Sequence, residues 1–560
     1  MRRVAGLLAP ALVILAFPSC VTRDNTLGSN LVPLSHLYDV YTLEFPLTDI
    51  QMKMLDSLSG YSNTRMTIGA VRDAEFGLTT RACALSLVPV ADTVDFGKNP
   101  VFKSFRFTAA RDTISYADPT EKDILQNINV YELQDPMDFT FVDLNTPVAH
   151  KSERITDGIP VYNGKDSLTF NFSKAFGEKY MQITTEDLKD MKEYLKKFPG
   201  IYIDTDEPVG IGGRINMFNL QLGVNLSYGY VTKDYANLKF SAEFDGVRKD
   251  SSYLFYFSPN DFVDLNTLIQ AKKESDYPDY YTFPQYCFNS TSHETRGREG
   301  PVTDKIVIEG GGGLKAVFSA QEILDRMRED ISKHGDPAEA VVTRASLVLP
   351  FEFPENYTEM FKYPDYLSPT CRISYDEGVS FASITDVSTK SEDPGKINRS
   401  LLQYSPDITF HIQKLLATKE DTKISNYDIW MLLMSTEYFI ADNSNAEAMS
   451  EYMYKMQQMM YLNSIYNGYG GYGGYGGYGY GGYGYGYGGY GYGGYGGYGY
   501  SNYYSMALLA SMYNSSSSSS TKKSRIDMDK DRYFDAVLNG PEAPDGRVPM
   551  MRIVYALPKD

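Results

Sequence analysis

The sequence has few of the residues that build metal and redox sites, with 4 Cys, 5 His and 1 Trp among its 560 residues. The histidines lie far apart with no second ligand at metal spacing, so we expect no zinc site, no catalytic histidine and no cofactor; they are His36, His150, His293, His334 and His411. Basic residues are also in deficit, because 53 Lys and Arg against 71 Asp and Glu give a net charge of −18. Such a chain repels phosphate backbones, which argues against general nucleic-acid binding.

Catalytic motifs are also missing. Gly310–Gly313 follows the strand-like Lys305–Ile308 and resembles a phosphate loop, but Lys315 stands where a dinucleotide fingerprint needs Gly, and no Gly-Lys-Ser/Thr follows. A glycine-rich turn is the favoured interpretation. Asp527, Asp529 and Asp531 have the spacing of a calcium loop, but Arg532 and Leu538 replace its required Gly and Glu, so we favour an acidic turn. We therefore expect a protein that is not an enzyme.

The N-terminus carries an export signal. Met1-Arg2-Arg3 is positively charged, and the uncharged, mostly apolar run Val4–Phe17 is too short to span a bilayer. The run ends at Ser19-Cys20, which has the form of a bacterial lipoprotein processing site. We expect residues 1–19 to be removed and Cys20 to be acylated, which gives stable membrane anchoring once two or more chains are attached. The alternative is an ordinary cleaved signal in which Cys20 has no role. No later run of 18 or more apolar residues exists, so the protein is expected to be tethered rather than embedded.

The remaining cysteines, Cys83, Cys287 and Cys371, are odd in number, so at most one disulfide can form. The favoured interpretation is three buried small hydrophobic side chains.

The body of the chain is β-rich. Asn219–Tyr228 alternates strictly between apolar and polar residues, and Leu168–Phe172 and Leu238–Phe244 repeat the pattern. Alternation of this kind predicts a mainly β fold of two antiparallel sandwich-like units with a few short helices. Helices are expected from Thr184 to Lys197 and, after a Ser319–Glu322 capping box, to about Lys333. The expected organisation is a signal peptide at 1–19, a lipidated tether at 20–40, a first β-rich domain at 41–295 and a second at 296–440 completed by 525–560.

Two unusual segments separate residue 440 from the C-terminal strand. Met449, Met453, Met456 and Met460 form one stripe of a helix expected over 441–466, and such a stripe favours core or a soft contact surface over metal binding. Residues 467–524 form a Gly/Tyr- and Ser-rich insertion that we expect to be disordered. Within it, 468–500 consists only of 20 Gly and 13 Tyr. Regularly spaced phenols allow self-association through stacking, and the alternative is a tolerated loop expansion. Because Met551–Leu557 alternates again, the insertion is expected to lie in a loop before the last strand.

Several segments resemble a family of Bacteroidota outer-membrane lipoproteins, domain of unknown function 4270. They are Leu27–Leu31, Ile68–Gly77 with its Gly-x-x-x-Asp-x-x-Phe-Gly pattern, Phe198–Ile203 and the strand into Leu349-Pro350. The resemblance covers roughly residues 20–440 and the last strand. It implies an exported, lipid-anchored protein of the outer membrane, on the periplasmic or cell-surface side, with no known activity.

Four Asp-Ser/Thr-apolar triplets resemble the O-glycosylation acceptor of the same bacteria, which makes Ser57, Thr93, Thr113 and Ser167 candidate glycosylation sites. Two functions remain open. The first is a non-enzymatic structural, assembly or binding role, with the membrane reached through acylated Cys20 and an envelope protein or glycan as partner. The second is a glycan-binding or glycan-processing lipoprotein, which an aromatic face flanking a carboxylate pair in a cleft would favour.

Overall fold

The computed structural model describes residues 37–119, 124–137, 142–257, 262–274, 283–375, 378–384, 393–419, 422–440 and 522–559. Cys20, the signal peptide, the tether up to residue 36, His36, the Met-striped segment and the Gly/Tyr tract lie outside these ranges. The expectations about them therefore stay predictions.

The prediction of a mainly β fold with a few short helices is confirmed. Six antiparallel sheets make up most of the described residues, together with five α-helices. The helices are α2 (Lys174–Tyr180), α3 (Met191–Lys197), α4 (Leu265–Glu274), α5 (Ala320–Ile331) and α6 (Thr409–Leu416).

The first unit, strands β3 to β20, contains two large sheets. The ten-stranded sheet has β10 (His150–Arg154), β9 (Gln126–Leu133), β13 (Ile201–Thr205), β5 (Gly77–Leu85), β4 (Arg65–Asp73), β14 (Gly212–Asn219) and β8 (Tyr116–Ala117) in that order, with β11 (Val161–Tyr162) beside β9, and β20 (Cys287–His293) beside β5 and β3 (Tyr61–Ser62). The five-stranded sheet has β12 (Leu168–Asn171), β7 (Lys98–Ala109), β17 (Tyr235–Phe244), β18 (Val247–Tyr256) and β6 (Val88–Pro89). A small third sheet has β16 (Tyr230–Lys233), β15 (Gln221–Asn225) and β19 (Phe283–Pro284).

One apolar cluster joins the two large sheets of the first unit. Ile68 and Val130 from the ten-stranded sheet share it with Phe105, Phe107 and Leu238 from the five-stranded sheet. Helices α2 and α3 add buried aromatic side chains to the same cluster. The first unit is therefore a sandwich with helices at its margin, as the alternating strands predict.

The second unit has a four-stranded sheet of β1 (Tyr38–Pro46), β31 (Met550–Pro558), β24 (Val341–Pro350) and β27 (Gln403–Tyr404). A seven-stranded sheet has β21 (Gly300–Pro301), β2 (Ile50–Met54), β23 (Leu314–Phe318), β28 (Ile429–Ile440), β25 (Tyr366–Tyr375) and β26 (Gly378–Ser383), with β29 (Lys522–Met528) also beside β28. The pair β22 (Lys305–Glu309) and β30 (Asp535–Asn539) completes the unit. A second apolar cluster lies between these sheets and includes α5 and α6.

The N-terminal strands do not belong to the first unit, although the first domain was expected to begin at residue 41. Strand β1 pairs along its whole length with β31, and β2 pairs with β23. Phe45 and Ile50 are accordingly buried in the core of the second unit. Residues 38–54 thus belong to the second unit, because alternation in a sequence identifies a strand but not its partner. Strand β31 returns to the second unit as predicted.

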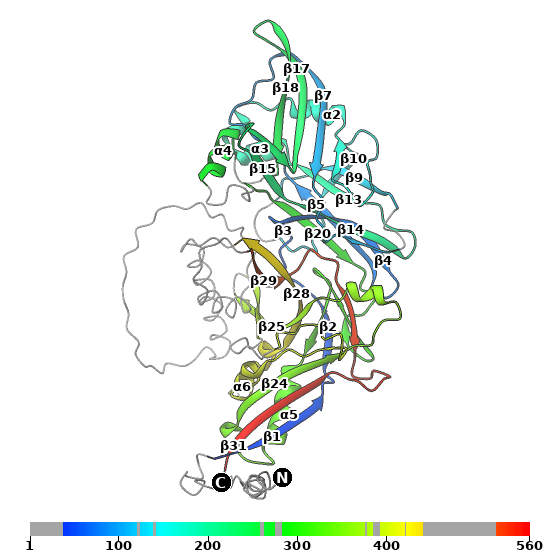
Figure 1. The fold of residues 1–560 in the computed structure, drawn as a ribbon, viewed down its shortest axis with the longest axis vertical. Helices are drawn as coiled ribbons and strands as arrows, with labels where there is room; N and C mark the ends of the chain where they lie inside the picture. The colour runs from blue at the N-terminus through cyan, green and yellow to red at the C-terminus, as the bar shows by residue number, and fades with distance from the viewer. Residues whose placement is uncertain are drawn as a thin grey trace, which may run out of the picture.

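The molecule is elongated, with the two units stacked end to end (Figure 1). Tyr38 pairs with Pro558, so the first and last strands lie together at one end. The hairpin of β17 and β18 lies at the opposite end, in the first unit (Figure 1).

Candidate functional site

Charged side chains from both units meet in a buried layer between them, which we call the junction. Its members from the first unit are Asp73, Arg81, Asn289 and His293; those from the second are Glu309, Lys315, Lys362 and the segment 529–535. Arg81, Glu309 and Lys315 are at most 2% exposed. Because burying a charge is costly unless it is paired, each of these groups needs a partner that folding supplies.

The segment 529–535 connects the units. Lys530 Nζ donates to the carbonyl oxygens of Ser59, at 2.7 Å, and of Tyr61, both in the first unit. In the other direction, Arg81 Nη1 donates to the Lys530 carbonyl at 3.2 Å. Asn289 Nδ2 lies 3.4 Å from Asp531 Oδ1. This short stretch therefore makes reciprocal polar contacts with the first sandwich.

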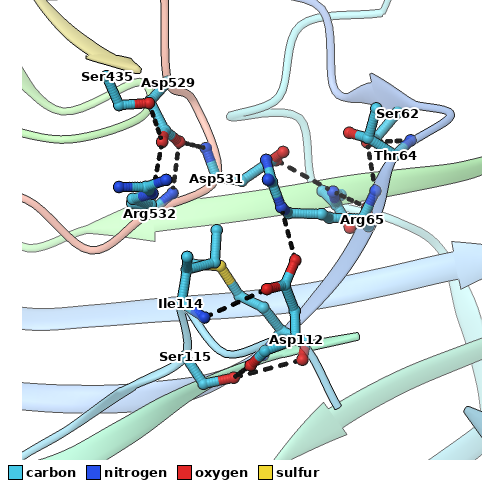
Figure 2. Close-up of polar contacts among 12 residues, drawn as sticks. Ser62, Thr64, Arg65, Asp112, Ile114, Ser115, Ser435, Asp529, Asp531 and Arg532 are labelled. Atoms are coloured by element: carbon cyan, nitrogen blue, oxygen red, sulfur yellow. Dashed lines mark hydrogen bonds and ion pairs between the residues drawn. The ribbon is translucent and has the colours of Figure 1, made fainter. Parts of the chain in front are cut away.

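Asp529 fixes the shape of that segment. Its carboxylate accepts from the Ser435 hydroxyl at 2.8 Å and from the backbone N–H groups of Asp531 and Arg532 at 3.1 and 2.8 Å. Arg532 Nε lies 2.9 Å from Asp529 Oδ2, as Figure 2 shows. Two of the three carboxylates that have the spacing of a calcium loop, those of Asp529 and Asp531, thus face donors of the protein itself. No cluster of three or more His, Cys, Asp or Glu suited to a metal occurs in the described ranges.

The glycine-rich turn Gly310–Gly313 packs directly against the first unit. A Cβ on Gly311 would lie 2.7 Å from both terminal nitrogens of Arg81, and one on Gly312 would collide with the Asn145 amide. Lys315 Nζ donates to the carbonyls of Glu309, Gly311 and Gly313 at 2.6, 3.0 and 2.9 Å. The glycines therefore allow close approach between the units, and the lysine closes the turn from inside.

Burial shifts the junction toward neutral groups. It lowers the pKa of the Lys315 amine to about 7, against the opposing effect of the Glu309 carboxylate. Burial likewise raises the pKa of Glu309 and of Asp531. The pKa of His293 is well below its usual range because of burial and the neighbouring positive charges of Arg81 and Lys315. All four shifts have desolvation as their main cause.

An ion pair between Lys362 and Asp73 joins the two units at the edge of the junction. Lys362 Nζ lies 2.6 Å from Asp73 Oδ2 in the first unit and 2.6 Å from Glu359 Oε2 in its own unit. Asp73 also accepts from the backbone N–H groups of Glu75 and Phe76 at 2.7 and 3.1 Å. Burial raises the pKa of Asp73, but these hydrogen bonds and the Lys362 charge outweigh it and lower the pKa overall.

Some junction atoms have no partner among the described residues. They include the donors Arg81 Nε and Nη2 and the acceptors Glu309 Oε1 and Asn145 Oδ1, together with His293 Nε2. Groups of both kinds side by side are the usual setting for ordered internal water. Most junction side chains are buried, and their polar contacts join the two units to each other.

The surface of the first unit carries a groove of about 250 Å³ at one end of the ten-stranded sheet. Its lining includes the buried residues Gly213 and Arg214 of β14 and the exposed residues Leu125, Asp206 and Val209. The mouths of curved sheets are common ligand sites, although this lining contains no aromatic ring among the described residues. Alternation patterns do not reveal the groove, because its rim comes from loops.

Near that groove lies a stack of three rings on neighbouring strands. His150 on β10 lies between Tyr131 on β9, at 4.7 Å between ring centroids, and Tyr202 on β13, at 4.3 Å. Asp204 and Asp206 follow Tyr202 at alternate positions of the same chain segment. Burial raises the pKa of Asp204, whereas hydrogen bonds from Asn129 and Asn127 lower that of Asp206. The sequence contained these residues, but only strand pairing brings them together.

The four candidate glycosylation residues all lie outside regular secondary structure. Thr93, Thr113 and Ser167 are exposed and Ser57 is half-buried. The carboxylate next to Thr113 has a structural role, because Asp112 Oδ2 lies 2.9 Å from Arg65 Nε (Figure 2). Their modification remains a prediction.

The three described cysteines are buried and unbridged. Cys83 pairs in register with Asn289, so Cys287 lies diagonally across the two strands. The two thiols nevertheless interact, since burial and a hydrogen bond with Cys287 both raise the pKa of the Cys83 thiol. Of the other histidines, His411 is buried with Nε2 3.1 Å from the Tyr427 carbonyl, and His334 stacks on Tyr41.

Comparison with known proteins adds no relative: no family model, no curated protein and no solved structure matches the chain. The resemblance to the lipoprotein family therefore remains a prediction from the quoted segments. None of the helices in the described ranges is long and apolar enough to cross a membrane.

Proposed function

We propose that this chain is an exported outer-membrane lipoprotein, anchored through acylated Cys20, with a non-enzymatic structural, assembly or binding role in the cell envelope. The observation that carries the proposal is the N-terminal sequence, a short apolar run ending in Ser19-Cys20. The fold is consistent with such an anchor. Strand β1 begins 18 residues after Cys20 at the end of the molecule opposite to the β17–β18 hairpin, so a tether there would hold the second unit near the membrane (Figure 1).

The junction supports a presenting role for the first unit. A layer of buried polar contacts resists bending between the units. Separating the units would break the hydrogen bonds and ion pairs of the junction before water could replace them, which costs free energy. A lipid-anchored protein with such a link would hold its distal sandwich in a constant orientation, which suits binding or assembly more than turnover of a substrate.

The anchor is tested by metabolic labelling with an alkyne fatty acid in cells that express the full chain. The wild type should take up label and fractionate with membranes, and Cys20→Ser should lose the label and enter the soluble fraction. Val21→Ala serves as the matched control and should behave as the wild type. Labelling of Cys20→Ser at the wild-type level, or an unlabelled wild type, would contradict the proposal.

A second candidate function is glycan binding or processing, favoured by the ring stack beside Asp204 and Asp206. Two carboxylates with pKa values shifted in opposite directions are the arrangement that general acid–base catalysis on glycosides uses. Hydrolysis of aryl glycosides by the wild type, and its loss in Asp206→Asn, would support processing. Calorimetry with neutral oligosaccharides on the wild type and Tyr202→Ala tests binding alone, and no heat and no hydrolysis with the wild type would remove this candidate.

A further inference from the structure

The five-stranded sheet of the first unit has one buried face and one exposed face. Phe105, Phe107 and Leu238 point into the core. On β7 and β17 the alternate positions Arg106 and Lys239 are exposed. The register aligns Arg106 with Asn171 of β12 on one side and with Asn237 of β17 on the other, and it aligns Lys239 with Ser104 and Ser252. We call this exposed surface the basic face.

The basic face continues to the tip of the hairpin. Glu243 of β17 lies between Lys98 of β7 and Arg248 of β18. Lys103, at a register shift in β7, reaches across β17 so that its Nζ lies 2.6 Å from Asp250 Oδ1. On the paired strands, five cationic residues stand against two carboxylates, and Asp245 at the turn adds a third, so the face up to the hairpin tip has a net charge of +2 in a chain whose net charge is −18.

Three of these cations form no ion pair within the part of the chain that the structure describes, although Glu243 is the cross-strand neighbour of Lys98. Beyond the backbone pairing of their strands, the side chains of Lys98, Arg106 and Lys239 make no hydrogen bond or ion pair in the described ranges, and all three residues are exposed. Around them are hydroxyl and amide side chains, namely those of Ser104, Asn171, Asn237 and Ser252. A flat surface with spaced, unpaired cations among neutral hydrogen-bonding groups is complementary to a polymer that carries both anionic groups and hydroxyls.

We propose that the basic face binds an acidic polysaccharide, through ion pairs from Lys98, Arg106 and Lys239 and hydrogen bonds from the neighbouring hydroxyl and amide groups. The negative charge of the rest of the chain does not prevent this, because at physiological ionic strength charges more than about 8 Å away are largely screened. The choice of a polysaccharide over a membrane surface rests on the proposed function. If the anchor holds the end that carries β1, the sheet that bears the basic face lies at the opposite end of the molecule, far from that membrane (Figure 1).

The test measures binding of the full-length protein, in detergent, to immobilised dextran sulfate and to uncharged dextran of the same length. The wild type should bind dextran sulfate only, and binding should weaken by about ten-fold or more between 50 and 200 mM salt, as expected for a few ion contacts. The variant Lys98→Gln/Arg106→Gln/Lys239→Gln should bind at least about ten-fold more weakly at low salt, because it loses the three unpaired cations.

The matched control is Lys192→Gln/Lys305→Gln/Lys419→Gln, which removes the same charge from three exposed lysines elsewhere. It should change binding less than about two-fold, and circular dichroism should show that both variants are folded. Equal losses in the two variants would mean that net charge alone decides and would overturn the proposal. Absence of binding by the wild type would overturn it too, as would binding to phosphatidylglycerol vesicles but not to dextran sulfate. None of these results depends on acylation, so fatty-acid labelling of Cys20 fails or succeeds independently.

Discussion

Replacing Lys362 by Met should show how much a buried ion pair of the junction contributes to the free energy of unfolding, compared with an ion pair on the surface. The methionine fills most of the lysine's volume but leaves Asp73 and Glu359 without their cation. Removing one partner of a buried pair typically costs about 3–5 kcal/mol of unfolding free energy. Here the cost should be lower, about 2–3 kcal/mol, because Asp73 keeps two backbone N–H donors and the Glu359 side chain is 37% exposed.

The assay is thermal and urea unfolding followed by circular dichroism. For units of this size each kcal/mol shifts the unfolding midpoint by about 2–4 °C, so Lys362→Met should lower it by roughly 4–12 °C. Lys333→Met is the control, since its ion pairs with Glu329 and Asp330 are 3.7 and 3.8 Å long and its side chain is 58% exposed. An exposed pair of this kind is worth less than about 1 kcal/mol.

A double-mutant cycle with Asp73→Asn isolates the pair across the two units. The coupling free energy between Asp73 and Lys362 should disappear as the pH falls, because Asp73 loses its charge. The pKa of Asp73 is lowered in the folded protein, so its contribution is present above the unfolded pKa of about 3.9 and is lost as pH falls through the folded value. If Lys362→Met were as stable as Lys333→Met, or if the cycle gave no coupling at neutral pH, the account of the junction would be refuted.

Three further predictions follow from other buried groups and from the insertion. Burial lowers the pKa of His411 to about 4, so between pH 6.5 and 4 only the unfolded chain binds a proton at this residue, and the unfolding free energy decreases as the pH is lowered. Urea titrations at these two pH values should show that His411→Gln removes up to about 3 kcal/mol of this decrease. The same pH dependence in the variant and the wild type would contradict the prediction. Phe107 is fully buried and stacks on Phe170 and Phe257, so Phe107→Ala should cost about 3–5 kcal/mol by thermal unfolding, and a cost below about 1 kcal/mol would be inconsistent with this core. Deleting residues 468–500 should leave the unfolding midpoint unchanged and reduce self-association in sedimentation. Unchanged self-association and surface retention would contradict the interpretation that the tract mediates self-association.

The sequence identified elements that depend on local pattern. Strands β12 and β31 and the start of α5 are where alternation and capping place them, and Ser319 does accept from the Glu322 N–H. Glu322, however, does not reach back to its own cap. Its carboxylate accepts from the backbone N–H groups of Thr48 and Asp49, which ties the turn between β1 and β2 to the start of α5.

Two local predictions were wrong in extent, each because a short polar side chain ended an element. The strand expected over Asn219–Tyr228 is divided between two elements: β14 ends at Asn219 in the ten-stranded sheet, and β15 in the three-stranded sheet runs only from Gln221 to Asn225. The Asn225 side chain accepts from the N–H groups of Ser227 and Tyr228 and turns the chain. The helix expected from Thr184 to Lys197 is divided at Asp190. A 3-10 turn covers Asp187–Lys189, with the Asp187 N–H donating to the Thr184 hydroxyl, and α3 begins at Met191, where the Asp190 carboxylate caps two N–H groups. Asn and Asp compete with regular structure in this way, so an apolar pattern alone overestimates element length.

The junction lay beyond what the sequence could reveal, because its contacts join residues far apart in the chain. Asp73 and Lys362 are 289 positions apart, and Lys530 lies 471 positions from Ser59. Asp73 stands in the Gly-x-x-x-Asp-x-x-Phe-Gly pattern of Ile68–Gly77, but that pattern does not indicate a partner 289 positions away. The one available signal was the glycine-rich turn, and its interpretation as a turn is in keeping with the structure, which adds the reason: each added Cβ would meet a neighbouring segment.

The topology also explains how a long insertion can lie next to the segment 529–535, which joins the two units at the junction. Strands β28 and β29 pair from Met434 with Met528 to Ile440 with Lys522, so the insertion joins the two open ends of one antiparallel ladder. The pairing sets where the chain re-enters the fold, and Asp529 follows at once with its contacts to Ser435 and Arg532. The length between Ile440 and Lys522 can therefore vary without moving the segment that joins the two units. In such an arrangement the tract can change or be lost during evolution while the orientation of the distal sandwich is preserved.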